Sequence, residues 1–590
     1  MNEIIVGIDL GTTNSEVAAF TREGVEVLGP EKEPILPSCV GIAPTGELLV
    51  GQAARHQYVL YPERTVRSVK RKMGTPETVT LGDKNFTPQE ISALILRRLA
   101  QWGQDSLGSP VKKAVITVPA YFSDVQRQAT REAGQLAGLE VVRILNEPTA
   151  ASLAYGFGRE GRHTALVYDL GGGTFDVSLV TVEGDVTEVL ASHGNNRLGG
   201  DDFDQQILER LLGEFRRQHG VDLSQGHPGA VARLHAAAEE AKKVLSFEHY
   251  VTVREESLAS RGEIPLHLEL ELSREEYEDM IRPLLESTLE SVSIALRDAG
   301  KTPGDLDAVL LVGGSTRTPL VTSLLHDRTG IEPRQDVDPD LCVALGAGVL
   351  ASRLSGRDVR QVLVDVSPYS FGPSYLGVRD GVAYPYCYRP IIRRNTPLPI
   401  TRTERYATCH PFQDTVEFEI YQGEHPDALQ NIPVGAFQVE GLQPIAEANE
   451  VLCRMSLDLD GILHVTAVEK CTGLSREITI SNALAIRSEE EMAAAAARLE
   501  ELYQGEQPAG AFRGRVLSAT TPVPDTPEHQ RARQLVEHSR GLLQGMNEQD
   551  LGDAVALHER IEAALESVDP DALAAAVKEL EDLLFFVETV

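Results

Sequence analysis

Two stretches of this chain, IIVGIDLGTTNSEVAAF at residues 4–20 and ALVYDLGGGTFDVSLVTV at residues 165–182, share one pattern. In each, an apolar strand ends at an Asp-Leu-Gly break with small residues, and an alternating strand follows, which is typical of a β-hairpin. Superposition of the two stretches pairs Asp9 with Asp169. A repeat in a matched frame predicts two similar halves that face each other.

The repeat lies within a longer region of alternating strands and helices. Apolar runs at residues 113–118 and 308–312 have the length of buried strands, and residues 124–137 have a helical pattern. This alternation predicts a layered α/β domain over residues 1–356. The next stretch, residues 357–366, carries a short apolar stripe between charged ends, and we interpret it as an interdomain linker and not as a core strand.

The rest of the chain changes character twice. Residues 367–485 contain short β-branched and aromatic runs separated by Gly, Pro and Asn, which predicts an all-β domain. Ser488 and Glu491 have capping-box spacing, and an Ala- and Leu-rich helix is predicted from there to about Tyr503. We interpret residues 486–590 as a terminal helical bundle, interrupted by a Pro- and Gly-rich break at 505–527, with helices near 528–544, 549–566 and 570–587.

The composition excludes several classes of protein. The 590 residues include 55 basic and 88 acidic side chains, a net charge of −33, which repels the phosphates of nucleic acids and lipids. The six cysteines form no CxxC pair, as in a reducing compartment. No apolar run reaches the ~20 residues of a membrane helix, and the N-terminus has no secretory pattern. We therefore expect a cytoplasmic protein that binds neither nucleic acid nor membranes.

The two Asp-Leu-Gly breaks are suited to anion binding. Small residues let backbone N–H groups approach phosphate oxygens closely, and the hydroxyls of Thr12, Thr13 and Thr174 add donors. Asp9 and Asp169 would face each other across this cradle, where the magnesium ion of a nucleotide would offset their repulsion. Either copy alone fits a glycine-rich turn equally well, but two copies in a matched frame favour the cradle.

A third glycine turn, LLVGGSTRTP at residues 310–319, follows a buried-type strand. Gly313 and Gly314 permit close approach of a flat ring or a phosphate, and the Arg317 guanidinium can stack on an aromatic base. Taken singly, this pattern fits a plain strand-to-helix turn better.

Two other candidates also have plainer interpretations. Residues 239–246 present an acceptor, two amines and a hydroxyl that could bind an adenosine, but their spacing favours a solvated helix face with ordinary ion pairs. Lys70 is most simply a surface lysine in a basic run. Glu147 precedes Pro148 and is most simply a turn residue.

The motifs taken together resemble a known family. The chain contains, in this order, IVGIDLGTTNS, VPAYFSDVQRQAT, NEPTAA, DLGGGTFDV, LGGDDFD, LLVGGSTRTP and VLVDVSP, and so resembles the DnaK-type chaperones, the seventy-kilodalton heat-shock family, over nearly its whole length. The resemblance implies an actin-like, ribonuclease-H-like duplicated ATPase domain, a β-sandwich peptide-binding domain and a helical lid. The chain departs from the usual family pattern at Pro373, Leu376 and Cys409, and at Gln361 in the linker. Taken with the HPFQD and PIIRRNTPLP segments, these departures make it more similar to the divergent bacterial HscC-type branch.

The resemblance also implies roles for residues of the ATPase domain, with ATP or ADP, Mg²⁺ and K⁺ as cofactors. Hydrolysis would use Lys70, Asp9, Glu147, Asp169 and Thr174, of which Asp9 and Asp169 hold Mg²⁺. Asp176 is in the place of a potassium ligand. The nucleotide would be bound by Gly11, Thr12, Thr13, Asn14, Gly171, Gly172, Gly173, Gly200, Glu239, Lys242, Lys243, Ser246, Gly313, Gly314, Ser315, Arg317 and Asp340.

Further roles follow for the β-domain and for communication between domains. The implied peptide-binding residues are Pro373, Tyr375, Leu376, Tyr406, Cys409, Val416 and Phe418. Pattern alone fits Tyr406 and Phe418 equally well as ordinary core. Coupling would use Pro119, Arg127, Arg143, Asn146, Val362, Leu363, Val364 and Asp365. Of these, Arg143, Asn146 and Asp365 would receive a J-domain co-chaperone, and a nucleotide exchange factor is a further implied partner.

The sequence therefore predicts an ATP-dependent chaperone that binds extended apolar polypeptide segments and releases them in a cycle driven by ATP hydrolysis and nucleotide exchange. A specialised regulatory chaperone with a narrow client set remains an alternative. An actin-like structural ATPase or a sugar kinase would share the phosphate cradle, but the linker and the β-domain argue against both.

Overall fold

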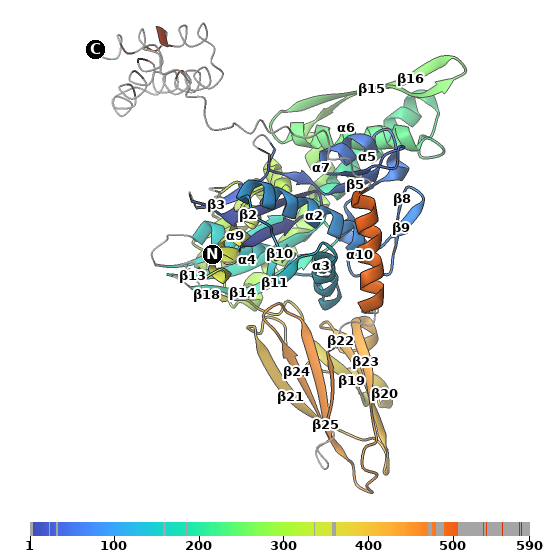
Figure 1. Cartoon of the computed structure of the whole chain (residues 1–590), viewed down its shortest axis with the longest axis vertical. Coiled ribbons are helices and arrows are strands. Elements are labelled where there is room, and N and C mark those ends of the chain that lie inside the picture. Colours follow the sequence, from blue (N-terminus) through green and yellow to red (C-terminus); the bar gives the residue numbers. More distant parts are fainter. Residues whose placement is uncertain are drawn as a thin grey trace. The chain divides into compact units, whose positions relative to one another are not determined.

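The computed structural model describes residues 4–22, 24–30, 33–156, 161–184, 186–335, 337–356, 362–469, 475–479 and 489–504, and a few scattered positions beyond residue 530. Its contacts divide the chain into two units, Met1–Glu506 and Gln507–Val590. Ser488, the predicted break at 505–527 and nearly all of the helices predicted after it lie outside the described residues. The description below concerns the first unit (Figure 1).

The first hairpin lies in a sheet of order β11-β10-β1-β2-β3, to which β4 is added through β2. The bounds are β1 (Ile5–Leu10), β2 (Asn14–Phe20), β3 (Val25–Leu28), β4 (Leu36–Pro37), β10 (Lys113–Val118) and β11 (Glu140–Asn146). β1 pairs in parallel with β10 and antiparallel with β2. Every residue of β1 is buried, because α2 (Pro88–Leu107) and α9 (Cys342–Leu354) pack against it.

The second sheet repeats this arrangement in the order β17-β12-β13-β14-β18. Its strands are β12 (Arg162–Leu170), β13 (Phe175–Glu183), β14 (Val186–Asn195), β17 (Ala308–Val312) and β18 (Val362–Val364). Asp9 lies opposite Glu16 in the first hairpin, and Asp169 lies opposite Asp176 in the second. The duplicated hairpins that the sequence predicts are therefore confirmed.

The two halves share a core that contains α4 (Glu147–Gly156) and α9. Residues of both sheets, including Val115 and Val167, belong to it. The helices approach so closely that a Cβ atom at Gly346 would lie 1.8 Å from the carbonyl oxygen of Ala150. Glycine is therefore required where these helices meet.

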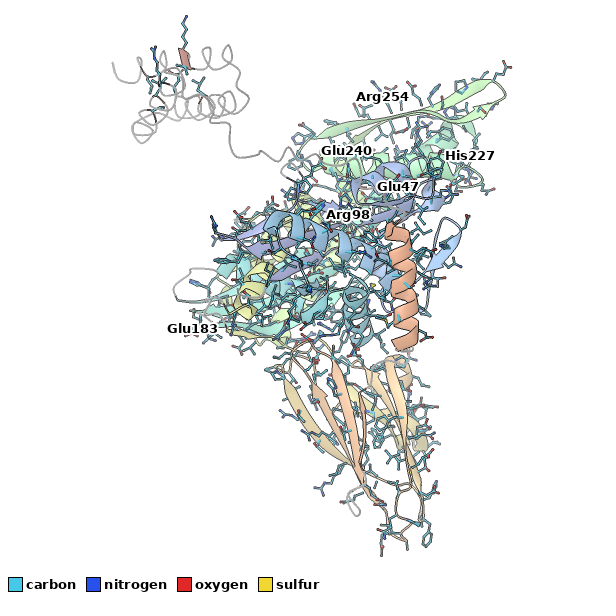
Figure 2. The ribbon with its side chains drawn as sticks, in the orientation of Figure 1. Glu47, Arg98, Glu183, His227, Glu240 and Arg254 are labelled. Carbon is cyan, nitrogen blue, oxygen red and sulfur yellow. The ribbon has the colours of Figure 1, made fainter. Side chains whose placement is uncertain are left out.

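Each half also carries an outer layer of helices and strands. Among the described residues, no helix is both long enough and apolar enough to cross a bilayer. Exposed charges such as Glu183, Glu240 and Arg254 lie on the outside of the molecule (Figure 2). The outer elements of the first half are β5 (Cys39–Ile42), β6 (Leu48–Val50), α1 (Gln52–Tyr58), β7 (Thr65–Arg67), β8 (Val79–Leu81) and β9 (Lys84–Phe86). Those of the second half are α5 (Gly200–His219), α6 (Pro228–Leu245), β15 (Tyr250–Arg261), β16 (Ile264–Ser273), α7 (Arg274–Asp298) and α8 (Pro319–Thr329).

The predicted all-β domain consists of two four-stranded sheets, β20-β19-β22-β23 and β21-β24-β25-β26. Residues of both sheets, including Ile420, Val439, Val451 and Met455, form one core, so the domain is a sandwich. Its strands are β19 (Phe371–Arg379), β20 (Val382–Tyr388), β21 (Ile400–Ala407), β22 (Thr415–Gln422), β23 (Ile432–Glu440), β24 (Glu450–Leu457), β25 (Leu463–Glu469) and β26 (Ser475–Thr479).

The linker is a strand in this structure, unlike our interpretation of the sequence. β18 pairs in parallel with residues 186–188 of β14, and Leu363 packs against the core shared by the two halves. The apolar stripe has the length of a short strand, and the open edge of β14 supplies its partner. The sequence alone did not show that this edge was available.

The β-domain contacts the first domain through α3 (Asp124–Leu136) and β11. The backbone N–H of Leu463 donates to Asp124 Oδ1 (3.0 Å), and the N–H of Ile144 donates to Asp460 Oδ1 (3.0 Å). Arg131 forms an ion pair with Asp460. The contact is therefore largely polar.

The helix predicted to about Tyr503 is present as α10 (Glu489–Gln504), and it packs against α2 (Figure 1). Ala495 and Leu499 belong to the same core as α2. The hydroxyl of Tyr503 donates to the carbonyl oxygen of Leu94 (3.0 Å). In this arrangement the first predicted lid helix is therefore held by the first domain.

Asp124 should make the contact between the domains depend on pH. Burial raises the pKa of Asp124 to about 7, against an ordinary value of 3.8. Docking therefore takes up a proton, so it should weaken by up to about tenfold per unit as the pH rises from about 4 to about 7. The change Asp124→Asn keeps an acceptor for Leu463 N–H and removes the charge, so it should abolish this trend.

Hydrogen exchange of the Leu463 amide between about pH 5 and about pH 8, corrected for the intrinsic exchange rate, measures this effect. The change Asp105→Asn, at an exposed position of α2, is the matched control and should keep the wild-type trend. Equal pH trends in the wild type and in Asp124→Asn would contradict the prediction.

Candidate functional site

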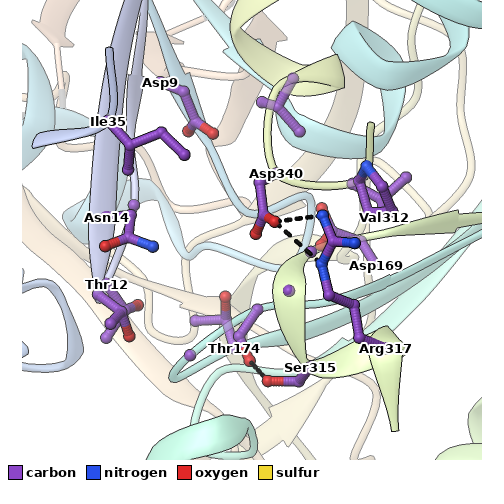
Figure 3. Close-up of a pocket in the computed structure, with 18 of the residues that line it drawn as sticks. Asp9, Thr12, Asn14, Ile35, Asp169, Thr174, Val312, Ser315, Arg317 and Asp340 are labelled. Atoms are coloured by element: carbon purple, nitrogen blue, oxygen red, sulfur yellow. Dashed lines mark hydrogen bonds and ion pairs between the residues drawn. The ribbon is translucent and has the colours of Figure 1, made fainter. Parts of the chain in front are cut away.

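A cavity of about 440 Å³ lies between the two halves, where the hairpins β1–β2 and β12–β13 meet (Figure 3). The predicted site residues that line it are Asp9, Gly11, Thr12, Thr13, Asn14, Lys70, Glu147, Asp169, Gly171, Gly172, Thr174, Glu239, Lys242, Lys243, Ser246, Gly313, Gly314, Ser315, Arg317 and Asp340. Lining residues that the sequence analysis did not single out include Glu16, Ile35, Phe247 and Val343. The structure thus gathers residues from across the first 343 positions.

Three predicted residues lie behind the cavity wall instead of on it. Gly173 packs against Thr12, and the N–H of Gly200 donates to the carbonyl oxygen of Gly171 (3.0 Å). Asp176 accepts the backbone N–H groups of Ala120 (3.0 Å) and Tyr121 (3.1 Å). These residues can support the wall, but they do not line the space that a ligand would fill.

The loops of the two hairpins touch each other. A Cβ atom at Gly172 would lie 1.8 Å from Thr13 Oγ1 and 3.0 Å from Thr13 Cβ, so glycine is required at this approach. The wall here consists of glycine backbone and the side chains of Thr12, Thr13 and Thr174. This is the composition that the sequence predicts for an anion cradle.

The carboxylates of Asp9 and Asp169 both line the cavity. Asp9 Oδ1 accepts a hydrogen bond from the Thr117 hydroxyl (2.6 Å), and Asp169 Oδ2 is buried with no hydrogen-bond partner among the described residues. Lys70, only 3% exposed, forms an ion pair with Glu147. The interpretation of Lys70 as a surface lysine is therefore wrong, and Glu147 is buried at the start of α4.

Burial disfavours the charged forms of these carboxylates. It raises the pKa of Asp9 and of Asp169, and the neighbouring charges of Glu147 and Asp176 raise the pKa of Asp169 further. Hard carboxylate oxygens are the ligands that Mg²⁺ prefers, and a cavity of this size has room for an ion with much of its water shell. The unpartnered oxygen of Asp169 and the Asp9 carboxylate in the same cavity thus fit a hydrated divalent cation.

Glu239 lies on α6 at the cavity wall, and its charge is fully compensated. Arg67 Nη2 donates to Glu239 Oε2 (2.8 Å), while Lys243 Nζ and Arg55 bind Oε1. Burial would raise its pKa, but Lys243, Arg67 and Arg55 together lower it to about 2. At 4% exposure, Glu239 is not part of a solvated face, so that interpretation is wrong for it. No motif marks the two arginines, because they lie 172 and 184 residues away in sequence.

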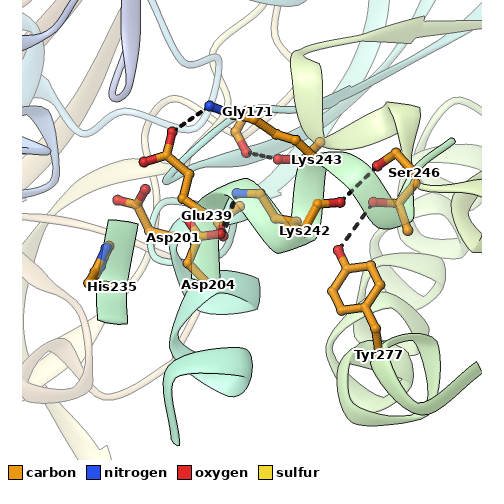
Figure 4. A network of polar contacts seen from close by, with 12 residues as sticks. Gly171, Asp201, Asp204, His235, Glu239, Lys242, Lys243, Ser246 and Tyr277 are labelled. Carbon is orange, nitrogen blue, oxygen red and sulfur yellow. Dashed lines mark hydrogen bonds and ion pairs between the residues drawn. The ribbon is translucent and has the colours of Figure 1, made fainter. Parts of the chain in front are cut away.

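The remaining polar groups are also held in place. Lys242 Nζ lies 2.8 Å from Asp204 Oδ1, and Ser246 donates to the carbonyl oxygen of Lys242 (Figure 4). The Arg317 guanidinium donates twice to Asp340 Oδ2, from Nε (3.1 Å) and Nη2 (2.7 Å) (Figure 3). A planar cation fixed beside an apolar wall suits stacking of a flat ring.

Comparison with known proteins places this site in a family. The family model described as Hsp70 protein matches residues 5–511. The chain belongs to the Hsp70 family. Chaperone protein DnaK of Thermosipho africanus is 45% identical over 487 residues, which cover 81% of this chain and 80% of that protein. Chaperone protein DnaK of Thermotoga neapolitana is 45% identical over 491 residues, with the same two shares.

This Hsp70 is an ATP-dependent molecular chaperone, and its enzymatic activity is that of an ATPase. The resemblance predicted from the order of the motifs is confirmed. The closer similarity to the HscC-type branch stays a prediction.

The predicted peptide-binding residues of this Hsp70 do not share one environment. Tyr375 and Leu376 on β19 are 37% and 52% exposed, and Cys409 is exposed. Phe418 is buried and stacks on Phe437, with ring centroids 5.3 Å apart. The alternative of ordinary core therefore holds for Phe418 in this conformation. Of the others, Tyr406 packs edge-on against Phe418, Val416 is half-buried and Pro373 is buried.

The predicted coupling residues lie together where the two domains meet. Arg127 Nη2 donates to Asn146 Oδ1 (2.7 Å), and Asn146 Nδ2 donates to Asp365 Oδ2 (2.8 Å). Arg143 Nε lies 3.6 Å from Asp460 Oδ1. The remaining members are Pro119, whose carbonyl oxygen accepts the N–H of Phe122, and the β18 residues Val362, Leu363 and Val364.

The contact between Gly172 and Thr13 generates a prediction. The change Gly172→Ala should force the two hairpin loops apart, because the added methyl group meets Thr13, and an overpacked contact costs about 1–3 kcal/mol. We expect the affinity for a fluorescent ADP analogue to fall about fivefold or more. The matched control is Gly213→Ala on α5, where no atom lies within 4 Å of the added Cβ. Equal nucleotide affinity in both variants would contradict the close contact.

Proposed function

We propose that the cavity binds ATP and ADP together with Mg²⁺, and that hydrolysis there controls how tightly the β-domain binds extended apolar polypeptides. The observation that supports this most is the meeting of two glycine-rich hairpins, a buried lysine and an unpartnered carboxylate in one cavity. Backbone N–H groups of the hairpins would bind the phosphates. The polar face of α6 and the turn that carries Arg317 would bind the adenosine.

The protein's own residues would act mainly by position and charge, as phosphoryl transfer requires. Lys70 Nζ, fixed by Glu147, would place a positive charge beside the transferred group, and the Thr174 hydroxyl would donate to it. Asp9 and Asp169 would hold the hydrated Mg²⁺, which supplies neutralisation of phosphate charge when it is bound. A K⁺ ion at Asp176 stays a prediction, and the two backbone N–H groups on that carboxylate already satisfy it in part.

The β-domain would bind extended segments of unfolded polypeptides through backbone hydrogen bonds and apolar contacts. Exposed apolar side chains on β19 and β20, among them Leu376, Val378 and Val382, support this proposal. A J-domain co-chaperone would bind around Arg143, and a nucleotide exchange factor would complete the cycle. We place this cycle in the cytoplasm.

Docking of β18 on β14 would carry the signal between the domains. With nucleotide triphosphate bound, β18 would stay in the sheet and the β-domain would stay docked. Hydrolysis would release both. A coupling free energy of about 1–3 kcal/mol corresponds to a change of roughly 5- to 150-fold in peptide affinity.

The role of Lys70 can be tested by Lys70→Ala. Loss of this charge should lower single-turnover ATP hydrolysis roughly 10²- to 10³-fold, because a preorganised charge at the reacting group is removed. Binding of a fluorescent ADP analogue should change little, since the charge of Lys70 would act on the transferred phosphoryl group, which ADP lacks. Lys112→Ala, at an exposed position, is the control. Hydrolysis at the wild-type rate in Lys70→Ala would refute the assignment.

The role of β18 can be tested by Leu363→Asp. A carboxylate in place of Leu363 cannot pack against the shared core, so β18 should leave the sheet. ATP should then no longer release a bound fluorescent apolar peptide, measured by anisotropy, while basal ATP hydrolysis continues. Leu363→Ile keeps the apolar contact and should release peptide as the wild type does. ATP-triggered release from Leu363→Asp would show that coupling does not pass through β18.

A further inference from the structure

Glu16 is a buried carboxylate in the nucleotide cavity that no motif singled out. It lies on β2, is 2% exposed, and lines the cavity. The hairpin register places it directly opposite Asp9, and residues in this relation point to the same face of the sheet. Like charges in such a pair destabilise a hairpin. A second acidic side chain beside Asp9 therefore needs a compensating partner.

In the second hairpin, the carboxylate at the position equivalent to Glu16 has hydrogen-bond donors from the protein. There Asp176 lies opposite Asp169, and its two oxygens accept the backbone N–H groups of Ala120 and Tyr121. Glu16 has no such donors, since no hydrogen bond or ion pair to its carboxylate is formed among the described residues. The duplicated halves thus differ at one point: one carboxylate is satisfied by the protein, and the other is not.

The charges that face Glu16 from the neighbouring elements do not supply that partner. Asp9 on β1, Asp340 before α9 and Glu147 on α4 add to the effect of burial, and together they raise the pKa of Glu16 well above its ordinary value. Lys70 acts in the opposite direction, but it is already paired with Glu147. Among the described residues no positive charge is thus left over for Glu16, and the side of Glu16 that lies open to a ligand is the cavity.

We propose that Glu16 and Asp9 together hold a second hydrated divalent cation, which enters the cavity with the nucleotide. This rests on the proposed function, and it adds a cation to the one placed between Asp9 and Asp169. Mg²⁺ is commonly held by one or two carboxylates and several waters, which suits this pair at the wall of an open cavity. In the described residues no three acidic, His or Cys side chains converge closely enough to cage an ion directly, which agrees with a hydrated one.

The number of divalent cations that the chain binds can be measured with Mn²⁺. The full chain, loaded with a non-hydrolysable ATP analogue, is titrated with Mn²⁺, and free Mn²⁺ is measured by electron paramagnetic resonance. We expect the wild type to bind one more Mn²⁺ per chain than Glu16→Gln, which has the same shape without the charge. Glu214→Gln, on α5 and outside the cavity, is the control and should bind as many as the wild type.

Thermal unfolding gives an independent readout. Glu16→Gln should melt at a higher temperature than the wild type in chelator, because one carboxylate of a repelling pair is gone, and Mg²⁺ added together with the ATP analogue should narrow the difference. Equal Mn²⁺ counts would mean that a proton neutralises Glu16, and would overturn the proposal. Binding of a fluorescent ADP analogue is measured in parallel. If the analogue does not bind to the wild type, the proposed function is overturned. If it binds but the wild type and Glu16→Gln bind equal numbers of Mn²⁺ ions, only this inference is overturned.

Discussion

The site of this Hsp70 depends on the buried carboxylates that its duplicated hairpins bring to one cavity. Asp9 and Asp169 line one cavity, and the lysine buried beside them is already paired with Glu147. Burial raises the pKa of both aspartates, which means that their charged forms are disfavoured there. In the proposed function, a nucleotide that enters with Mg²⁺ would relieve this penalty, and its binding would therefore stabilise the folded site.

The same hairpins connect the cavity to the β-domain. Asp176, opposite Asp169 in the second hairpin, binds the backbone N–H groups of Ala120 and Tyr121. The carbonyl oxygen of Tyr121 in turn accepts a hydrogen bond from the hydroxyl of Tyr369 in the β-domain (2.9 Å). A shift of the hairpin when its ligand changes would therefore move a group that the β-domain binds directly.

Sequence reasoning succeeded where the signal is local. The duplicated hairpins, the glycine turns and the all-β domain follow from short patterns, and the structure has them all; that this domain is a sandwich was implied only by the family resemblance. Lys70 and Glu239 were misjudged from pattern alone, because their partners are set by tertiary contacts that span 77 and up to 184 residues. Glu16 could have been found from the hairpin register opposite Asp9. β18 required knowledge of an open sheet edge, which no local pattern contains.

The two carboxylate oxygens of Glu90 on α2 make two separate contacts. One carboxylate oxygen accepts the N–H of Thr87 (2.8 Å) and so caps the start of α2, while the other binds Arg498 of α10. The cap of α2 does not use the oxygen that binds Arg498, so loss of the α10 contact would leave the first turn of α2 formed. The surface of α2 that α10 covers would then keep its shape, and renewed packing of α10 would need no refolding of α2.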